Sequence, residues 1–316
     1  MPKVDLGALH ASQRSVIIDF AREPRPFSGR GIVTTVYDRE FASAWVLLSE
    51  LARLGVALPI EAFHRPGELS ERNAALIASF GPQVSLRRLN DRAERFAIKP
   101  WAIWRSSFRE VLWIDTDNFP LRDPGFLFDD PEFLQKGSLF WRDVTGADRS
   151  GMWHPQSDVW KVFNIPANDS EEFEAGQLLV DKEKRWAELG LVLSFVQNSI
   201  YQSLVHGDKD LFRLAWQYVA SARKKAPPPV DYLRDPGLVP YGFMPFGPFH
   251  MGRPNDVHKW GGGTVMVQRD RTGQALFNHR NVDKFSTGQN IFNADIQNEA
   301  IYHAHIERLR NLPSKR

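Results

Sequence analysis

Cysteine is absent from the 316 residues of this sequence. Its absence excludes a disulfide-stapled scaffold, a zinc site with thiolate ligands and a thiol nucleophile. A run of apolar residues long enough to span a bilayer is absent as well, and the N-terminus lacks the apolar segment of a signal peptide. We therefore expect a cytoplasmic protein, with peripheral attachment to a membrane left open.

An excess of charge of one sign is also missing. Lysine and arginine total 40 against 38 aspartates and glutamates, for a formal net charge of +2. This balance argues against a dedicated electrostatic binder of nucleic acid. Aromatic residues, by contrast, are plentiful, with ten tryptophans and 22 phenylalanines. Such side chains can line sugar sites, but we expect most of them in the core.

The first half of the chain alternates between short β-branched segments and segments with helical spacing. We expect strands over residues 31–36, 58–63, 84–86 and 111–114, and helices over 39–54, 68–80 and 93–107. This alternation predicts an α/β protein with a Rossmann-like, mostly parallel sheet sandwiched by helices. Further strands are expected over 139–143, 176–181 and 261–267, and further helices over 182–189 and 197–206.

No internal repeat and no long low-complexity linker divides the sequence. We therefore expect a single domain over residues 29–290, preceded by an N-terminal extension over 1–28 and followed by a helical tail over 291–316. Within the domain, residues 145–170 are polar and tryptophan-rich, and 224–256 begin with a proline cluster, so both are expected to form surface loops.

Two carboxylates, Asp115 and Asp117, directly follow the apolar segment 111–114. Open α/β sheets bind ligands at the carboxyl ends of their strands. Alternate residues of an extended strand point to the same side, so the two side chains can coordinate one hard cation, which in turn can hold a diphosphate. Taken alone, the sequence Asp115-Thr116-Asp117 is more often a turn in which aspartate accepts hydrogen bonds from local N–H groups.

Several other segments follow a recognisable order. They are Arg30-Gly-Ile-Val33, Leu58-Pro-Ile-Glu61, Lys99-Pro100, Ser106-Ser-Phe108, Val111–Asn118, Asp123-Pro124, Leu127-Phe128, Phe140–Asp143, Glu174–Gln177 and His206–Asp210. Together they closely resemble the fungal Golgi alpha-1,3-mannosyltransferase family and its bacterial relatives, over roughly residues 29–285. The resemblance implies a GT-A glycosyltransferase fold carrying the DxD motif, a nucleotide-sugar donor, a Mn²⁺-type cation and retention of anomeric configuration. The sequence departs from the fungal pattern in lacking cysteines and a membrane anchor.

The segment Phe277–Lys284 resembles a part of related retaining GT-A enzymes in which a histidine binds the metal and a later lysine meets the diphosphate. The likeness implies that His279 is a metal ligand beside the aspartate pair and that Lys284 contacts phosphate. Mn²⁺ accepts oxygen and imidazole ligands together, and Mg²⁺ is the alternative cation. His258, just before a run of three glycines, is a competing ligand.

Four residues are candidates for binding the donor beside Asp115. Thr34, Thr35 and Tyr37 end the first expected strand, where this fold binds the nucleotide base and ribose. Lys99 precedes the aspartate pair and is expected to fold back onto Asp115 or onto a donor phosphate.

Three residues are candidates for catalysis. Glu174 and Gln177 occupy a position that faces the donor's anomeric carbon in similar retaining enzymes. A carboxylate there acts as a nucleophile or stabilises an ion pair on the front face of the sugar. Asp208 is a rival, as an acceptor-binding or donor-hydroxyl contact. Each carboxylate alone is also typical of a helix cap or an exposed charge.

The leading hypothesis is a metal-dependent, retaining alpha-mannosyltransferase that uses GDP-mannose and a hydroxyl-bearing acceptor. Residues 29–290 are then the catalytic domain, with 145–170 and 224–256 as loops on the acceptor side. A UDP-hexose donor on the same fold, a nucleotidyltransferase and a non-catalytic carbohydrate-binding protein are the alternatives. The acceptor stays open among a glycan, a lipid-linked saccharide, a protein and a small metabolite.

Overall fold

The computed structural model describes residues 5–22, 26–89, 97–142, 151–168, 172–205, 207–225 and 266–280, together with 284–286, 288, 290, 292 and 296–313. His258 and most of the expected loop 224–256 lie outside these residues, as do 143–150.

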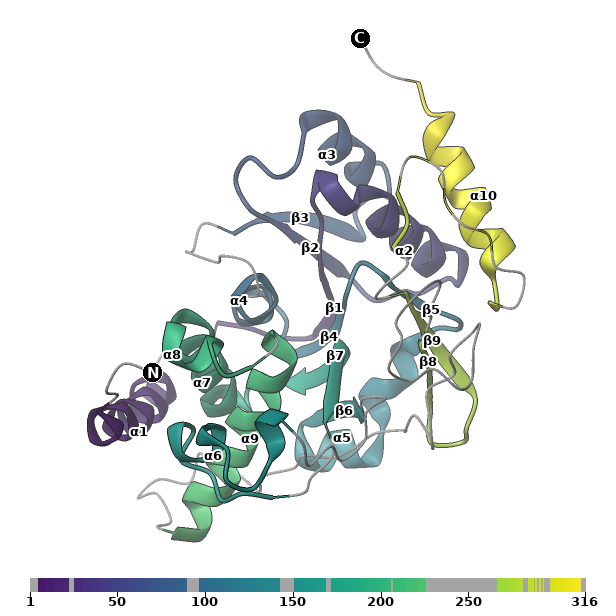
Figure 1. Ribbon diagram of the computed structural model, residues 1–316. Coiled ribbons are helices and arrows are strands. Elements are labelled where there is room, and N and C mark those ends of the chain that lie inside the picture. Colours follow the sequence, from purple (N-terminus) through teal and green to yellow (C-terminus); the bar gives the residue numbers. More distant parts are fainter. Residues whose placement is uncertain are drawn as a thin grey trace.

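A six-stranded sheet in the order β3-β2-β1-β4-β7-β6 forms the centre of the molecule (Figure 1). Its strands are β1 (Arg30–Thr35), β2 (Ile60–His64), β3 (Val84–Arg88), β4 (Glu110–Ile114), β6 (Ser138–Arg142) and β7 (Phe173–Asp181). β1 to β4 pair in parallel, whereas β7 is antiparallel to both of its neighbours. The predicted α/β class with a mostly parallel sheet is confirmed.

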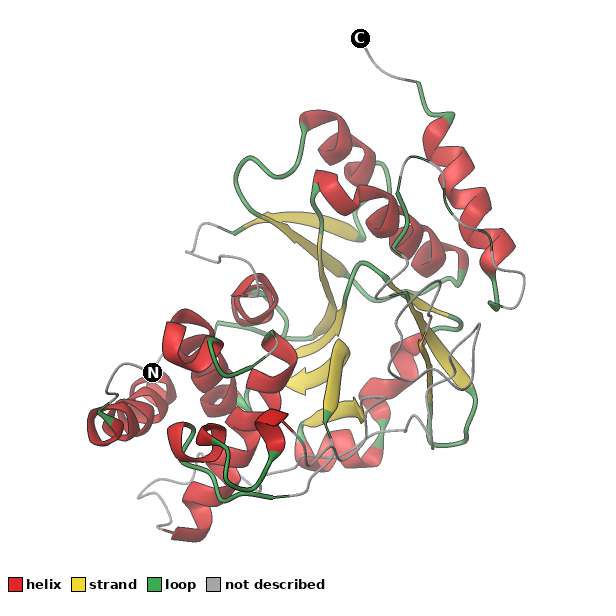
Figure 2. Cartoon of the chain, viewed as in Figure 1, coloured by secondary structure: helices red, strands yellow, loops and turns green. Residues whose placement is uncertain are grey.

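Helices cover both faces of this sheet, as Figure 2 shows. They are α1 (Leu6–Arg22), α2 (Phe41–Arg53), α3 (Glu71–Ala78), α4 (Ile98–Arg105), α5 (Pro131–Lys136), α6 (Asp158–Val162), α7 (Trp186–Gln197), α8 (Ser199–Gln202), α9 (Asp208–Lys225) and α10 (Glu299–Arg310). Alternate residues of β4 enter different cores. Val111 and Trp113 pack with α4, α7 and α9, whereas Leu112 and Ile114 pack with α2 and α10. Burial on both faces explains why the strand is a continuous apolar run.

A second, three-stranded sheet lies beside the first, in the order β5-β9-β8. Its strands are β5 (Asn118–Pro120), β8 (Met266–Arg269) and β9 (Ala275–His279), and both pairings are antiparallel. β5 begins just after the aspartate pair, and its first residue, Asn118, is opposite His279. This pairing joins the middle of the sequence to its last part.

Both ends of the chain contain helices that pack on the body of the protein. In α1, the Gln13 side chain donates to the Val162 carbonyl at 3.2 Å and to the Tyr201 hydroxyl at 2.8 Å. In α10, the His305 carbonyl accepts from the Trp45 indole of α2 at 3.0 Å. The segment expected as an extension therefore contributes α1 to one core, and the segment expected as a tail contributes α10 to the other.

Several elements differ from the sequence-based expectation. The helix expected from residue 182 begins at Trp186, because the Asp181 carboxylate accepts from the backbone N–H groups of Glu183 and Lys184 and holds a turn there. The expected helix 197–206 is the short α8, and the segment 145–170 contains α6. Helix α9 was not expected at all, although Leu211, Ala215 and Val219 repeat at helical spacing.

Among the described helices, none is both long and apolar enough to cross a bilayer.

Candidate metal and donor site

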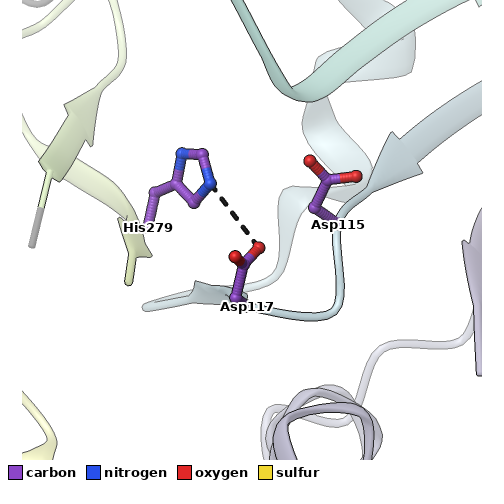
Figure 3. Close-up of side chains that lie close together, drawn as sticks. All are labelled: Asp115, Asp117 and His279. Carbon is purple, nitrogen blue, oxygen red and sulfur yellow. Dashed lines mark ion pairs between the residues drawn. The ribbon is translucent and has the colours of Figure 1, made fainter. Parts of the chain in front are cut away.

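Three potential ligands converge at the carboxyl end of β4 (Figure 3). Asp115 follows β4 directly, Asp117 precedes β5, and His279 is the last residue of β9. One ligand atom from each of the three lies within 4.8 Å of the others. The pairing of β5 with β9 brings His279 to the aspartates from far along the sequence.

Asp115 is fixed from three directions. Its backbone N–H donates to the Gly176 carbonyl at 2.7 Å, and the Trp113 indole donates to Oδ1 at 2.8 Å. The Lys99 ammonium lies 3.1 Å from Oδ2. Burial raises the pKa of Asp115, and the nearby carboxylates of Asp117 and Asp208 add to the rise while Lys99 opposes it. A further cation at this position would relieve the repulsion between the carboxylates.

Asp117 is more deeply buried, with 3% of its surface exposed. Its Oδ1 lies 3.5 Å from His279 Nε2, and its Oδ2 lies 2.9 Å from the Lys284 ammonium. Burial by itself would raise the pKa of Asp117, but His279 and Lys284 outweigh burial and hold the pKa well below its usual range. The carboxylate is therefore ionised and available as a ligand at neutral pH.

The His279 ring packs against the backbone of Gly176 in β7. A Cβ atom on this glycine would come within 2.5 Å of the ring Cε1. No role for Gly176 followed from the sequence alone. The available signal was a glycine inside an expected strand, which often marks a close approach of another group.

An irregularity in β7 shapes this part of the site. Its register with β6 jumps from the pair Phe140–Leu178 to the pair Trp141–Glu174. The intervening residues of β7 serve the site instead, since the Ala175 carbonyl accepts from Lys99 at 2.7 Å and the Gly176 carbonyl accepts from Asp115. Bulges are common next to active sites, where they re-aim groups of a strand.

Lys99 is surrounded by three acceptors of the protein itself. Besides Asp115 and the Ala175 carbonyl, its Nζ lies 3.1 Å from Asp208 Oδ2 at the start of α9. Asp115 and the Ala175 carbonyl accept hydrogen bonds from the ammonium, and Asp208 lies within ion-pair distance. The carboxylates raise its pKa despite burial, and the group stays charged. The expected fold-back onto Asp115 is present, whereas contact with a phosphate stays a prediction.

Gln177 and Glu174 are both buried at the edge of the site. The Gln177 Oε1 accepts from Asn118 Nδ2 at 2.5 Å, while its Nε2 has no partner among the described residues. The Glu174 Oε2 lies 3.6 Å from His279 Nδ1. Glu174 thus approaches His279, Gln177 contacts the residue that follows Asp117, and Asp208 is connected to Asp115 through Lys99.

The residues expected to bind the nucleoside lie at the end of β1. Thr34 is fully buried and its hydroxyl has no partner within the described part of the chain, and Thr35 is 6% exposed. Tyr37 is half-buried. Burial, and to a lesser extent a hydrogen bond with Glu40, raises the pKa of Tyr37. Glu40 also pairs with Lys284 at 3.0 Å, which connects this edge to the aspartates. Contact with a nucleoside stays a prediction.

The donor set fits a divalent cation. Two carboxylates and one imidazole match the ligand preferences of Mn²⁺, and Mg²⁺ is the harder alternative. His279 Nδ1 has no hydrogen-bond partner among the described residues, so the ring is not committed to a purely structural bond. The Lys284 ammonium lies 2.9 Å from Asp117 Oδ2, and its side chain is 37% exposed. It can therefore contact an anionic ligand of the cation.

Fold and site together define a mixed α/β protein with a candidate divalent-metal site at the carboxyl end of its central strands. A family model described as "Mannosyltransferase putative" matches residues 29–153. This match covers β1 to β6 and includes the aspartate pair. The resemblance inferred from the sequence is confirmed.

Curated relatives are similar at low identity. Alpha-1,2-mannosyltransferase MNN2 of Saccharomyces cerevisiae is 23% identical over 215 residues, which cover 54% of this chain and 36% of that protein. Putative alpha-1,3-mannosyltransferase MNN14 of Candida albicans is 22% identical over 230 residues, or 60% and 33% of the two chains. The matched region thus spans about a third of each of these relatives.

Solved glycosyltransferase structures are similar more distantly. The galactosyltransferase LgtC, in complex with donor and acceptor sugar analogs, aligns with a TM-score of 0.43 and 18% identity over 58% of this chain and 69% of that one. The glycosyltransferase GlyE of Streptococcus pneumoniae TIGR4 aligns with a TM-score of 0.42 and 15% identity over 59% and 43%.

Proposed function

We propose that this protein is a metal-dependent glycosyltransferase that moves mannose from GDP-mannose to a hydroxyl-bearing acceptor with retention of configuration. The observation that carries the proposal is the convergence of Asp115, Asp117 and His279, with Lys284 beside them. The similarity to mannosyltransferases supports mannose as the sugar.

Asp115, Asp117 and His279 would hold the cation, and Lys284 would offer its ammonium to the diphosphate. A divalent cation, when bound, neutralises the charge that develops on the leaving diphosphate without a proton transfer. The buried surroundings of Asp117 strengthen each of these electrostatic interactions relative to water. Thr34, Thr35 and Tyr37 are proposed to bind the nucleoside at the neighbouring strand end.

The reaction breaks the bond between the anomeric carbon and a diphosphate oxygen, and it forms a bond from that carbon to the acceptor oxygen. The acceptor hydroxyl loses its proton to the leaving diphosphate or to solvent, so the products are the glycoside and GDP. Gln177 carries a buried amide N–H₂ without a partner among the described residues, and we assign it a hydrogen bond to the donor sugar. Two further carboxylates lie next to this site. Glu174 contacts His279, and Asp208 contacts Lys99.

Titration calorimetry with GDP and with UDP, each with and without Mn²⁺, tests the donor. We expect GDP to bind in a Mn²⁺-dependent manner and UDP to bind at least tenfold more weakly, a difference of about 1.4 kcal/mol. Preference for UDP would instead support the UDP-hexose alternative. If neither nucleotide binds in a metal-dependent way, the transferase proposal is overturned and a carbohydrate-binding role becomes the better explanation.

Hydrolysis of GDP-mannose by Asp117→Ala tests the site itself. We expect loss of hydrolysis by about two orders of magnitude, because one charged ligand of the cation is removed. Asp129→Ala is a suitable control, since this carboxylate is largely exposed and lies at a distance from the site in an ion pair with Arg30. Full activity of the Asp117 variant would overturn the assignment.

A further inference from the structure

The His279 ring lies between two carboxylates. Its Nε2 faces Asp117 Oδ1 at 3.5 Å, and its Nδ1 faces Glu174 Oε2 at 3.6 Å. Both distances exceed a normal hydrogen bond, so the contacts act mainly through charge. The ring is 4% exposed, and therefore the two carboxylates interact with it through little water.

The backbone of β7 limits how this ring can turn. Gly176 lies so close to the ring that a Cβ atom there would meet Cε1 at 2.5 Å and Nδ1 at 2.7 Å. Glu174 comes from the same strand, two residues earlier. One short piece of β7 thus supplies both the surface that the ring packs against and the carboxylate that faces Nδ1.

We infer that Glu174 is a positioning residue for the metal ligand His279, and not the nucleophile of the reaction. Its carboxylate favours a proton on Nδ1, which leaves the lone pair of Nε2 directed toward the aspartate pair. Histidines that bind metals usually donate their other N–H to a carboxylate or carbonyl, which fixes the tautomer and the ring orientation. This inference rests on the proposed metal site.

The assignment changes the expected division of labour around the donor. If Glu174 orients His279, its carboxylate must stay beside the imidazole ring. A nucleophile must instead face the anomeric carbon. Gln177 has a free buried amide among the described residues and is the member of the Glu174–Gln177 segment left to face the sugar.

The affinity for Mn²⁺ in the absence of donor separates the two roles of Glu174. For Glu174→Gln we expect Mn²⁺ to bind 10- to 100-fold more weakly, roughly the effect of losing such an outer partner. At saturating Mn²⁺ most of the kcat for donor hydrolysis should return. Unchanged Mn²⁺ affinity together with a kcat that stays low at every metal concentration would overturn the inference and identify a nucleophile.

Glu172→Gln is the matched control. Glu172 is a buried carboxylate two residues before Glu174, and its Oε2 pairs with the Lys209 ammonium at 3.2 Å. Because its partner is Lys209 of α9 and not His279, its variant should bind Mn²⁺ like the wild type. Equal losses in both variants would show a general effect of removing charge and would count against the inference.

The position of the proton on His279 gives a readout that does not depend on catalysis. Nitrogen NMR of histidine-labelled protein loaded with diamagnetic Zn²⁺ in place of Mn²⁺ should show His279 protonated on Nδ1 in the wild type and a mixture of tautomers in Glu174→Gln. If Glu174→Gln does not fold, Glu174→Asp, which withdraws the carboxylate by one methylene, serves in its place. Identical tautomers in wild type and variant would overturn the inference. A wild type that binds no Mn²⁺ would overturn the proposed metal site instead.

Discussion

Gly176 is the residue whose change should be felt most directly at the metal site. Its hydrogen atom leaves room for the His279 ring, and a methyl group would approach the ring to 2.5 Å. We expect Gly176→Ala to lower the free energy of unfolding by about 1–3 kcal/mol, as overpacking does. It should also weaken Mn²⁺ binding, because the ring must shift from its present position beside Asp117.

Calorimetry and thermal unfolding of Gly176→Ala, beside Gly288→Ala, measure this effect. Among the described residues, a Cβ on Gly288 would meet the Ser286 hydroxyl alone, at 3.6 Å, so that variant should behave like the wild type. Wild-type Mn²⁺ affinity in Gly176→Ala would show that the ring position is not limited by β7.

Lys99 provides a second prediction for a single residue, because it neutralises two buried or half-buried carboxylates. Lys99→Met would leave Asp115 and Asp208 without their cation, and breaking a buried pair in this way costs about 3–5 kcal/mol. Added Mn²⁺ would restore part of the lost charge balance. We therefore expect a lower Tm that Mn²⁺ raises more in the variant than in the wild type.

Lys161→Met is the control for this measurement. Lys161 pairs with Asp158 at 3.4 Å, and both side chains are more than half exposed. Exposed pairs contribute about 0–1 kcal/mol, so its Tm should hardly change. A Tm of Lys99→Met equal to that of the wild type would mean that the three contacts of the ammonium are dispensable.

Among the elements, those with a strong local signal were predictable. β4 was recognisable because burial on both faces makes Val111 to Ile114 a continuous apolar run, and the ligand end of such a strand follows from the topology of parallel sheets. The position of Asp115 and Asp117 therefore followed from the sequence. α9 was overlooked, although its apolar residues repeat at helical spacing.

The pairing of β9 with β5 could not be worked out from local signals, because it joins distant parts of the sequence. His279 was identified only through the family resemblance. The irregular register of β7 was not predicted either, because a glycine inside a strand often marks a bulge but does not show where the pairing is interrupted. The role of Gly176 depends on both of these features.

The contact of α10 with α2 predicts a dependence of stability on acid. The Glu50 carboxylate of α2 lies 2.7 Å from His305 Nε2 and accepts hydrogen bonds from Arg53. Burial alone would raise the pKa of Glu50, but these partners hold the pKa below its ordinary value of 4.5. A depressed pKa stabilises the fold above that ordinary value, and the contribution is lost as the pH falls through the folded-state pKa.

Glu50→Gln should therefore flatten part of the acid limb of the stability curve. Urea unfolding between pH 7 and pH 3 measures it, with Glu307→Gln as a control in an exposed pair of α10. A wild-type acid limb in Glu50→Gln would contradict the expected contribution of this carboxylate.

At the scale of the whole molecule, one buried lysine predicts a rise of stability with pH. The Lys182 ammonium is fully buried and donates to the carbonyls of Ser106 at 2.7 Å and Trp104 at 3.2 Å. Burial lowers the pKa of Lys182 to about 7, against an ordinary 10.5, with Glu61 opposing the shift. Between these values the unfolded chain binds the proton more tightly, so stability increases with pH.

The slope from one such group reaches at most about 1.4 kcal/mol per pH unit. Lys182→Met should remove it, and urea unfolding between pH 7 and 10 would reveal the difference. Lys136→Met, at the end of α5 and away from this contact, is the control. An unchanged slope in Lys182→Met would mean that the ammonium is not the source of the rise.

The junction of β5 with β9 has a consequence for how such proteins can diversify. It fixes both ends of the chain that runs from the aspartates to His279, so the ligands meet regardless of how long the intervening chain is. Each doubling of a flexible connection costs only about 0.6 kcal/mol in closure entropy. The pairing, and not the length of the chain between the two strands, therefore sets the ligand geometry. In the proposed function, the parts of the chain that choose the acceptor can change while the cation site stays the same.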